Sequence, residues 1–242
     1  MKNRKINFLI MGIILCAILC APGYKEVAQT VSKLVNMPVV VLDPGHGGID
    51  GGAESSGGMS EKDINLDIAK MLKKQLEKRD VRVIMTREKD EGLYDENQAG
   101  AIRSLKTQDL KERKRIIDES GADLAVSIHL NSFTEDAGVH GAQVFYPAYG
   151  EELYIDESKR AAKILQQHLN EDINVTVSRS ELAKGDVFLL EDVKCPIVIV
   201  ECGFLSNPED ARNLGKAGHQ KKISQSMEKS ISKFLKEKNE KN

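Results

Sequence analysis

The chain has 242 residues, of which 40% are hydrophobic, and its formal net charge at pH 7 is −2. This length supports one sizeable hydrophobic core and argues against a second full domain. The near-neutral charge argues against nucleic-acid binding, and the absence of Trp argues against a module that stacks on sugar rings.

The N-terminal segment has the pattern of an export signal. Lys2, Arg4 and Lys5 precede an apolar run over residues 6–21, which is short for a membrane span of roughly 20 apolar residues. We expect residues 1–23 to be a signal peptide or an N-terminal membrane anchor. No clear cleavage site is present, so cleavage and retention both stay open. Residues 24–37 are expected to be a linker, and residues 38–238 the folded domain.

Apolar runs and amphipathic patterns alternate through that domain. Unbroken β-branched runs are typical of strands buried on both faces, and helices show an apolar stripe at a spacing of three and four residues. The alternation predicts a single α/β domain with a mostly parallel sheet and helices on both faces. The predicted strands are residues 38–42, 81–85, 124–128, 143–146 and 197–200, with 187–190 as a weaker candidate, and the predicted helices are 60–76, 110–120, 156–169 and 221–235.

Three further local features carry predictions. Ser60, followed by Asp63, predicts a helix N-terminus with a capping box. The polar segment 88–108 predicts a long surface excursion. Cys195 and Cys202 bracket one strand, which puts them about 20 Å apart at roughly 3.3 Å per residue. A disulfide needs Cα atoms within about 7 Å, so we expect no intrachain bridge.

Four polar side chains are expected at one edge of the sheet, because ligands bind at the carboxyl ends of parallel strands. His46 lies in a glycine-rich loop after the first strand, and His129 directly follows the third. Glu201 closes the last strand, and Glu61 lies at the start of the helix after the His46 loop. Chain order alone can bring these groups together.

Two histidines and a carboxylate with an open fourth position form a known catalytic zinc site. Zinc lowers the pKa of bound water from about 15.7 towards 7, and Glu201 is a candidate base and acid for amide hydrolysis. Each residue alone has an ordinary structural explanation, such as a hydrogen-bonding histidine or Glu61 at the positive end of its helix. Their shared location favours the zinc interpretation.

Four ordered motifs carry a family resemblance. They are Asp43-Pro-Gly-His-Gly-Gly48, Ser60-Glu-Lys-Asp-Ile-Asn-Leu66, Ser127-Ile-His-Leu-Asn-Ser132 and Val200-Glu-Cys-Gly-Phe-Leu-Ser-Asn207. From about residue 38 to 235 the chain resembles the zinc-dependent N-acetylmuramoyl-L-alanine amidases, which cut peptidoglycan between N-acetylmuramic acid and L-alanine. The resemblance implies a twisted sheet of about six strands.

By position, the resemblance makes His46, Glu61 and His129 the zinc ligands and Glu201 the catalytic glutamate. It also makes Arg113 and Asn131 candidate substrate-binding residues, while Asp118 departs from the family's usual Asn. Asp43 is a candidate to orient His46.

The excursion over residues 90–97 and 106–110 resembles the germination-specific, spore-cortex branch, whose members prepare muramic-δ-lactam formation. This implies an exported enzyme, acting between the forespore membranes, that the N-terminal segment or a partner protein holds at its substrate. Three alternatives remain open: an inactive peptidoglycan-binding protein, a zinc peptidase that cuts the stem peptide, and a cysteine nucleophile at Cys202.

Overall fold

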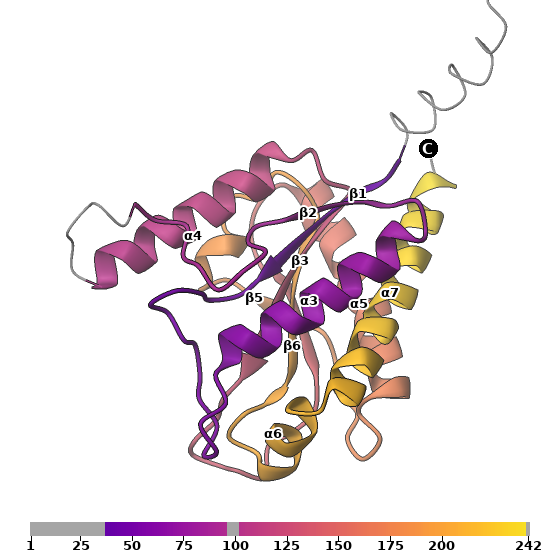
Figure 1. Ribbon diagram of the computed structural model, residues 1–242. Coiled ribbons are helices and arrows are strands. Elements are labelled where there is room, and N and C mark those ends of the chain that lie inside the picture. Colours follow the sequence, from indigo (N-terminus) through magenta and orange to yellow (C-terminus); the bar gives the residue numbers. More distant parts are fainter. Residues whose placement is uncertain (1–36, 96–101, 241–242) are drawn as a thin grey trace, which may run out of the picture. The chain divides into compact units, whose positions relative to one another are not determined.

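The computed structural model describes residues 37–95 and 102–240 (Figure 1). The predicted signal or anchor segment and nearly all of the predicted linker lie outside these residues. Within the described ranges, no helix is both long enough and apolar enough to cross a membrane.

The core of the fold is a six-stranded sheet with the order β2-β1-β3-β6-β4-β5. The first four strands in this order are parallel, while β4 is antiparallel to β6 and parallel to β5. The predicted α/β domain with a mostly parallel sheet is therefore confirmed. The strands are β1 (Val39–Pro44), β2 (Arg82–Met85), β3 (Leu124–Asn131), β4 (Gln143–Pro147), β5 (Leu182–Lys184) and β6 (Ile197–Phe204).

Helices cover both faces of the sheet, as Figure 1 shows. The helices α3 (Glu61–Glu77), α5 (Glu152–Asp172) and α7 (Ala217–Asn239) pack together on one face. On the other face lie α4 (Ile102–Glu119) and the 3₁₀ helix η1 (Phe188–Leu190), whereas the short α6 (Pro208–Leu214) follows β6. The sheet is thus a central layer between two helical layers.

Alternate residues of each strand face different helical layers. In β6, Val198, Val200 and Cys202 join the core beneath α3, α5 and α7, whereas Ile197 and Ile199 join the core beneath α4 and η1. Because side chains alternate with a period of two, burial on both faces requires the unbroken apolar run of the sequence. By the same alternation, the neighbours Glu201 and Cys202 are directed to opposite faces.

Three local predictions are corrected or completed. Residues 187–190 do not form a strand: Phe188–Leu190 is η1, whose Leu189 and Leu190 fill the core beneath α4. A four-residue apolar run is too short to show a period, so its pattern fits either structure. The sixth strand is instead β5, a three-residue edge strand, and the expected excursion is shortened because α4 begins at Ile102.

Ser60 is the N-cap of α3, but its side chain caps no helical N–H. Its hydroxyl donates to the Gly51 carbonyl at 2.8 Å, while the N–H groups of Glu61 and Lys62 donate to the carbonyls of Ala53 and Gly51. Since the loop before α3 folds back and supplies backbone acceptors to the first turn, the predicted capping box is not formed.

Candidate metal and catalytic site

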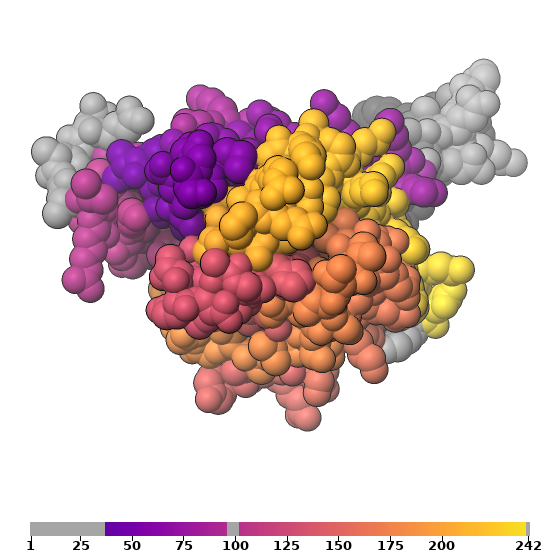
Figure 2. All heavy atoms as spheres, turned by 90° about the horizontal axis from the view of Figure 1, so that it is seen from below, coloured from indigo at the N-terminus to yellow at the C-terminus, as the bar shows by residue number. Residues whose placement is uncertain are grey.

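Loops from distant parts of the sequence meet beyond the carboxyl ends of β1, β3 and β6. Figure 2 views this end of the molecule and shows the indigo loop after β1 beside the gold of α6 and the rose segment after β3. The loop after β1 carries His46, the first turn of α3 carries Glu61, and β3 carries His129.

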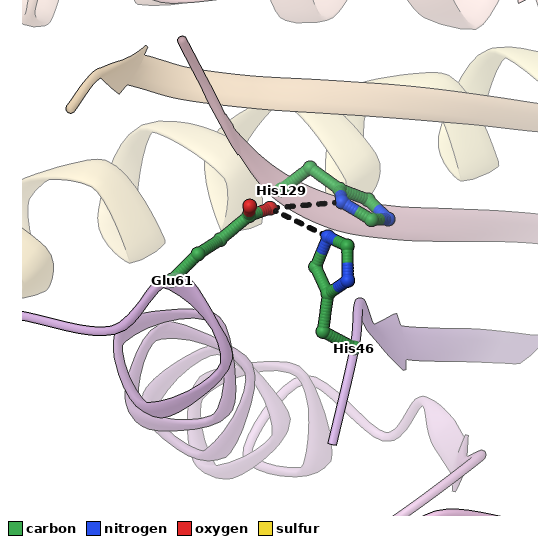
Figure 3. Close-up of side chains that lie close together, drawn as sticks. All are labelled: His46, Glu61 and His129. Carbon is green, nitrogen blue, oxygen red and sulfur yellow. Dashed lines mark hydrogen bonds and ion pairs between the residues drawn. The ribbon is translucent and has the colours of Figure 1, made fainter. Parts of the chain in front are cut away.

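His46, Glu61 and His129 converge on one point, as Figure 3 shows. The Oε1 atom of Glu61 lies 3.2 Å from Nε2 of His46 and 3.0 Å from Nδ1 of His129. One ligand atom from each residue lies within 4.8 Å of the others. A tetrahedral ion bonded at about 2.0–2.1 Å holds its ligand atoms roughly 3.3 Å apart, so these residues fit a metal ion with little movement.

Glu61 is held by backbone donors on both sides of its carboxylate. Ala53 N–H donates to Oε2 at 2.8 Å, and Leu130 N–H donates to Oε1 at 3.0 Å. Glu61 is buried at the positive end of α3, which favours the ionised form. Burial raises the pKa of this carboxyl, but the hydrogen bonds and charges of His129 and His46 outweigh burial and lower it.

The His46 ring is oriented by Asp50 and not by Asp43. The backbone groups of Gly47 and Asp50 bond to each other in both directions, at 2.9 and 3.1 Å, in a tight turn that folds Asp50 back onto the ring. His46 Nδ1 then lies 2.9 Å from Asp50 Oδ2. Burial lowers the pKa of His46, but the bonds to Asp50 and Glu61 raise it to about 9.

Asp43 lies one strand position from the loop and faces the interior. Its carboxylate is fully buried and accepts from Thr86 and Ser127 at 2.6 and 2.7 Å and from Arg113 Nη1 at 2.7 Å. The prediction that Asp43 orients His46 is therefore wrong. Burial raises the pKa of Asp43, yet Arg113 and the two hydroxyls lower it to about 2.

Arg113 is 1% exposed and binds the backbone of the loop that carries His46. Besides Asp43, its guanidinium donates to Asp109 and to the carbonyls of Pro44 and His46, at 2.6, 2.7 and 2.6 Å. This placement supports a role in fixing the His46 loop rather than the direct substrate contact predicted from the sequence.

The second predicted substrate-binding residue, Asn131, lies at the end of β3. It is partly exposed, and its side-chain oxygen accepts from Ser132 N–H at 2.8 Å. Asn131 thus lies on the same strand as His129, close to the edge where the metal-site residues gather, and its contact with substrate stays a prediction.

Glu201 lies next to the metal-site residues. It pairs in register with His129 on the neighbouring parallel strand, and its Oε2 atom is buried without a hydrogen-bond partner among the described residues. Burial raises the pKa of Glu201, while the charges of His129 and Lys184 act to lower it. A carboxylate with a raised pKa and an uncommitted oxygen is suited to proton transfer.

Cys202 does not share the site. Its side chain is 1% exposed in the core beneath α3, α5 and α7, and burial raises the pKa of its thiol. This placement argues against the cysteine-nucleophile alternative, because the reactive species is the thiolate. Cys195 and Cys202 are both free, so the prediction of no bridge between them is confirmed.

Comparisons with known proteins agree with this geometry. The family described as N-acetylmuramoyl-L-alanine amidase matches residues 40–233. The germination-specific N-acetylmuramoyl-L-alanine amidase of Bacillus subtilis is 38% identical over 200 residues, which cover 83% of this chain and 81% of the relative. The amidase AmiA of Escherichia coli is 28% identical over 235 residues, covering 81% and 76%.

A solved structure is similar over the same region. The CwlD amidase from Clostridioides difficile, solved in complex with the GerS lipoprotein, superposes with a TM-score of 0.77 at 40% identity. The match covers 82% of this chain and 98% of that one. With the motifs, the fold and the convergence of His46, Glu61 and His129, these matches show that the chain belongs to the N-acetylmuramoyl-L-alanine amidase family.

Proposed function

We propose that this amidase uses zinc, held by His46, Glu61 and His129, and that Glu201 is its catalytic base and acid. The observation that carries this proposal is the buried, unpartnered Oε2 of Glu201 one strand away from His129. Two histidines and one carboxylate with an open fourth position are a known donor set of catalytic zinc.

The reaction is hydrolysis of the amide between the lactyl group of N-acetylmuramic acid and L-alanine. Zinc in such a site lowers the pKa of water towards 7, which makes hydroxide available at neutral pH. Glu201 accepts a proton from the attacking water through its free oxygen. It then gives this proton to the alanine nitrogen as the C–N bond breaks, so the stem peptide leaves with a free amine.

Digestion of purified peptidoglycan, followed by mass analysis of the fragments, tests this proposal. We expect stem peptides with an N-terminal alanine, loss of activity in a chelator and recovery with zinc in preference to iron or manganese. Glu201→Gln should bind zinc and lose activity by at least about 100-fold, as expected for a general base. Cys202→Ala should retain zinc and most activity.

Other outcomes separate the alternatives. Peptides that begin at a later residue would point to a zinc peptidase. Binding to peptidoglycan without any release of peptide would point to an inactive binding protein. Normal turnover by Glu201→Gln or by the metal-free enzyme would contradict the proposed mechanism.

We further propose a role in spore-cortex modification. The support is the similarity to the germination-specific amidase and to the CwlD amidase, together with the resemblance of residues 90–97 and 106–110 to that branch. Expressed in a spore former that lacks its own enzyme of this type, the chain should restore muramic-δ-lactam in cortex, and Glu201→Gln should not. Vegetative-wall digestion in vitro without restoration of muramic-δ-lactam would contradict the cortex role.

The proposed substrate also predicts where the protein acts. Peptidoglycan lies outside the cytoplasm, which agrees with residues 1–23 being a signal peptide or membrane anchor that precedes a linker and a catalytic domain over residues 38–238. The CwlD amidase was solved with a lipoprotein, so we propose that a partner protein or the N-terminal segment localises this enzyme. Normal cortex modification by a chain lacking residues 1–23, without any binding partner, would contradict this.

A further inference from the structure

We propose that Lys106 of α4 is a positioning residue of the metal site, which acts through Asp50 to fix the His46 ring and so increases metal affinity. This inference rests on the proposed zinc site. It adds a contact from a helix that contributes none of the three ligands.

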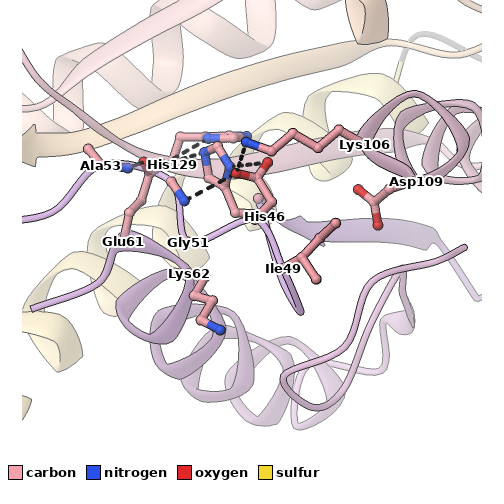
Figure 4. A network of polar contacts seen from close by, with 12 residues as sticks. His46, Ile49, Gly51, Ala53, Glu61, Lys62, Lys106, Asp109 and His129 are labelled. Carbon is pink, nitrogen blue, oxygen red and sulfur yellow. Dashed lines mark hydrogen bonds and ion pairs between the residues drawn. The ribbon is translucent and has the colours of Figure 1, made fainter. Parts of the chain in front are cut away.

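The contact is a chain of three side chains, with Asp50 between Lys106 and His46. Figure 4 labels its two ends, Lys106 and His46. Lys106 Nζ donates to Oδ1 of Asp50 at 2.7 Å. The other oxygen of the same carboxylate, Oδ2, lies 2.9 Å from Nδ1 of His46. Each oxygen of the Asp50 carboxylate therefore has its own partner, the Lys106 ammonium for Oδ1 and the His46 ring nitrogen for Oδ2.

This arrangement decides which ring nitrogen of His46 faces the metal. In the neutral form of the ring that binds a metal, Nδ1–H donates to Asp50 and the lone pair is on Nε2, which lies 3.2 Å from Oε1 of Glu61. A carboxylate behind a ligating imidazole fixes its tautomer and orientation. Asp50 can do this only while its own carboxylate is held, and at 23% side-chain exposure it is open to competing water.

Apart from a long contact of 3.4 Å from Gly52 N–H to Asp50 Oδ1, the other contacts of the loop hold its backbone and not the Asp50 carboxylate. Lys62 Nζ donates to the Gly48 carbonyl at 2.9 Å, and Arg113 Nη2 donates to the His46 carbonyl at 2.6 Å. Among the described residues, Lys106 is the one cationic side chain that is not part of the site itself and that bonds the carboxylate. Its role is therefore distinct from that of the buried arginine.

The sign of the effect separates positioning from plain electrostatics. A nearby positive charge repels a divalent cation, so removal of Lys106 would by Coulomb's law alone strengthen metal binding. Loss of orientation acts in the opposite direction. Changes to residues that orient a ligand typically cost about 10- to 100-fold in metal affinity, and Lys106 is one bond further away. We therefore expect a net weakening of about three- to tenfold.

Zinc affinity, measured by competition with a chromophoric chelator, tests the inference on the purified protein. Lys106→Met should bind zinc about three- to tenfold more weakly than the unsubstituted protein, and Lys106→Arg should recover most of the loss. Lys111→Met is the matched control, because Lys111 is exposed on the same helix and makes no hydrogen bond or ion pair among the described residues. This control should leave affinity unchanged. The side chain of Lys106 is 45% exposed, so its loss does not threaten the fold.

A double-mutant cycle shows whether the effect passes through Asp50. Asp50→Asn alone should cost about 10- to 100-fold in affinity. Adding Lys106→Met to Asp50→Asn should then cost no more than about twofold further. Unchanged or tighter zinc binding by Lys106→Met, or full additivity of the two substitutions, would overturn the inference. If the unsubstituted protein itself bound no zinc, the proposed zinc site would fail instead.

Discussion

Replacing Arg113 by Met tests how the buried ion pair supports the site. The substitution replaces the aliphatic stem of the side chain but leaves the fully buried Asp43 without its cation, while Thr86 and Ser127 still donate to it. Breaking a buried pair in this way typically costs about 3–5 kcal/mol.

Proton linkage gives a second estimate of the magnitude. The pKa of Asp43 is lowered from 3.8 to about 2, which corresponds to about 2.5 kcal/mol for burial, Arg113 and the hydroxyls of Ser127 and Thr86 taken together. Because the folded pKa is depressed, this stability is present above pH 3.8 and is lost as the pH falls through about 2. Without Arg113, burial pushes the pKa of Asp43 up, so acid unfolding should begin at a higher pH. Together the estimates predict a loss of about 2–5 kcal/mol at pH 7.

Urea unfolding in the presence of a chelator measures this loss without the contribution of a bound metal. The control is Arg115→Met on the same helix, where an exposed arginine pairs with Glu112 and Glu119 and should contribute little to stability, because solvent and salt screen exposed ion pairs. Asp43→Asn in the Arg113→Met background should recover part of the stability. A loss no larger than that of the control would refute the reasoning.

Three further predictions concern the site itself. Gly52→Ala should weaken zinc binding at least about tenfold, because Gly52 has φ +70° and an added Cβ would lie 2.5 Å from Oε2 of Glu61. Unchanged zinc affinity, measured by competition with a chelator, would contradict this prediction. Lys184→Met should move the acidic limb of the pH profile of kcat/KM to higher pH, because the Lys184 cation lowers the pKa of Glu201. A shift of this limb towards lower pH would contradict the prediction. Zinc binding at pH 7 should release about one proton, since the pKa of His46 is about 9. Calorimetry in buffers of different ionisation enthalpy measures this proton release. A binding enthalpy that does not depend on the buffer would contradict the prediction.

The sequence predicts the positions of His46, Glu61 and His129 better than the contacts that hold these side chains in place. His46 and His129 follow unbroken apolar runs, so strand-end placement brings them to one edge of the sheet. The ordered motifs add Glu61 and Glu201, which spacing alone leaves ambiguous. The structure brings the first three together and places Glu201 in register beside His129.

The supporting contacts could not be predicted because they depend on tertiary packing. Asp43 was the natural candidate to orient His46, being close in sequence, yet its strand position directs it into the core. Asp50 does so because the glycine turn folds the chain back, and the Gly-Gly pair followed closely by Asp was the available signal. Lys106 lies 56 residues from Asp50, and no periodic pattern connects the two.

The reversal of β4 and β5 within the sheet has an evolutionary consequence. The metal-site residues lie where parallel strands end, whereas Gln143, the first residue of β4, pairs with Glu201. The connection over residues 132–142, which leads into the reversed strand β4, therefore borders Glu201, the proposed catalytic residue. Insertions and deletions in this connection can change which glycan or peptide is admitted, while the proposed metal ligands keep their positions. Enzymes of this fold can therefore differ in substrate specificity while the residues at the strand ends stay the same.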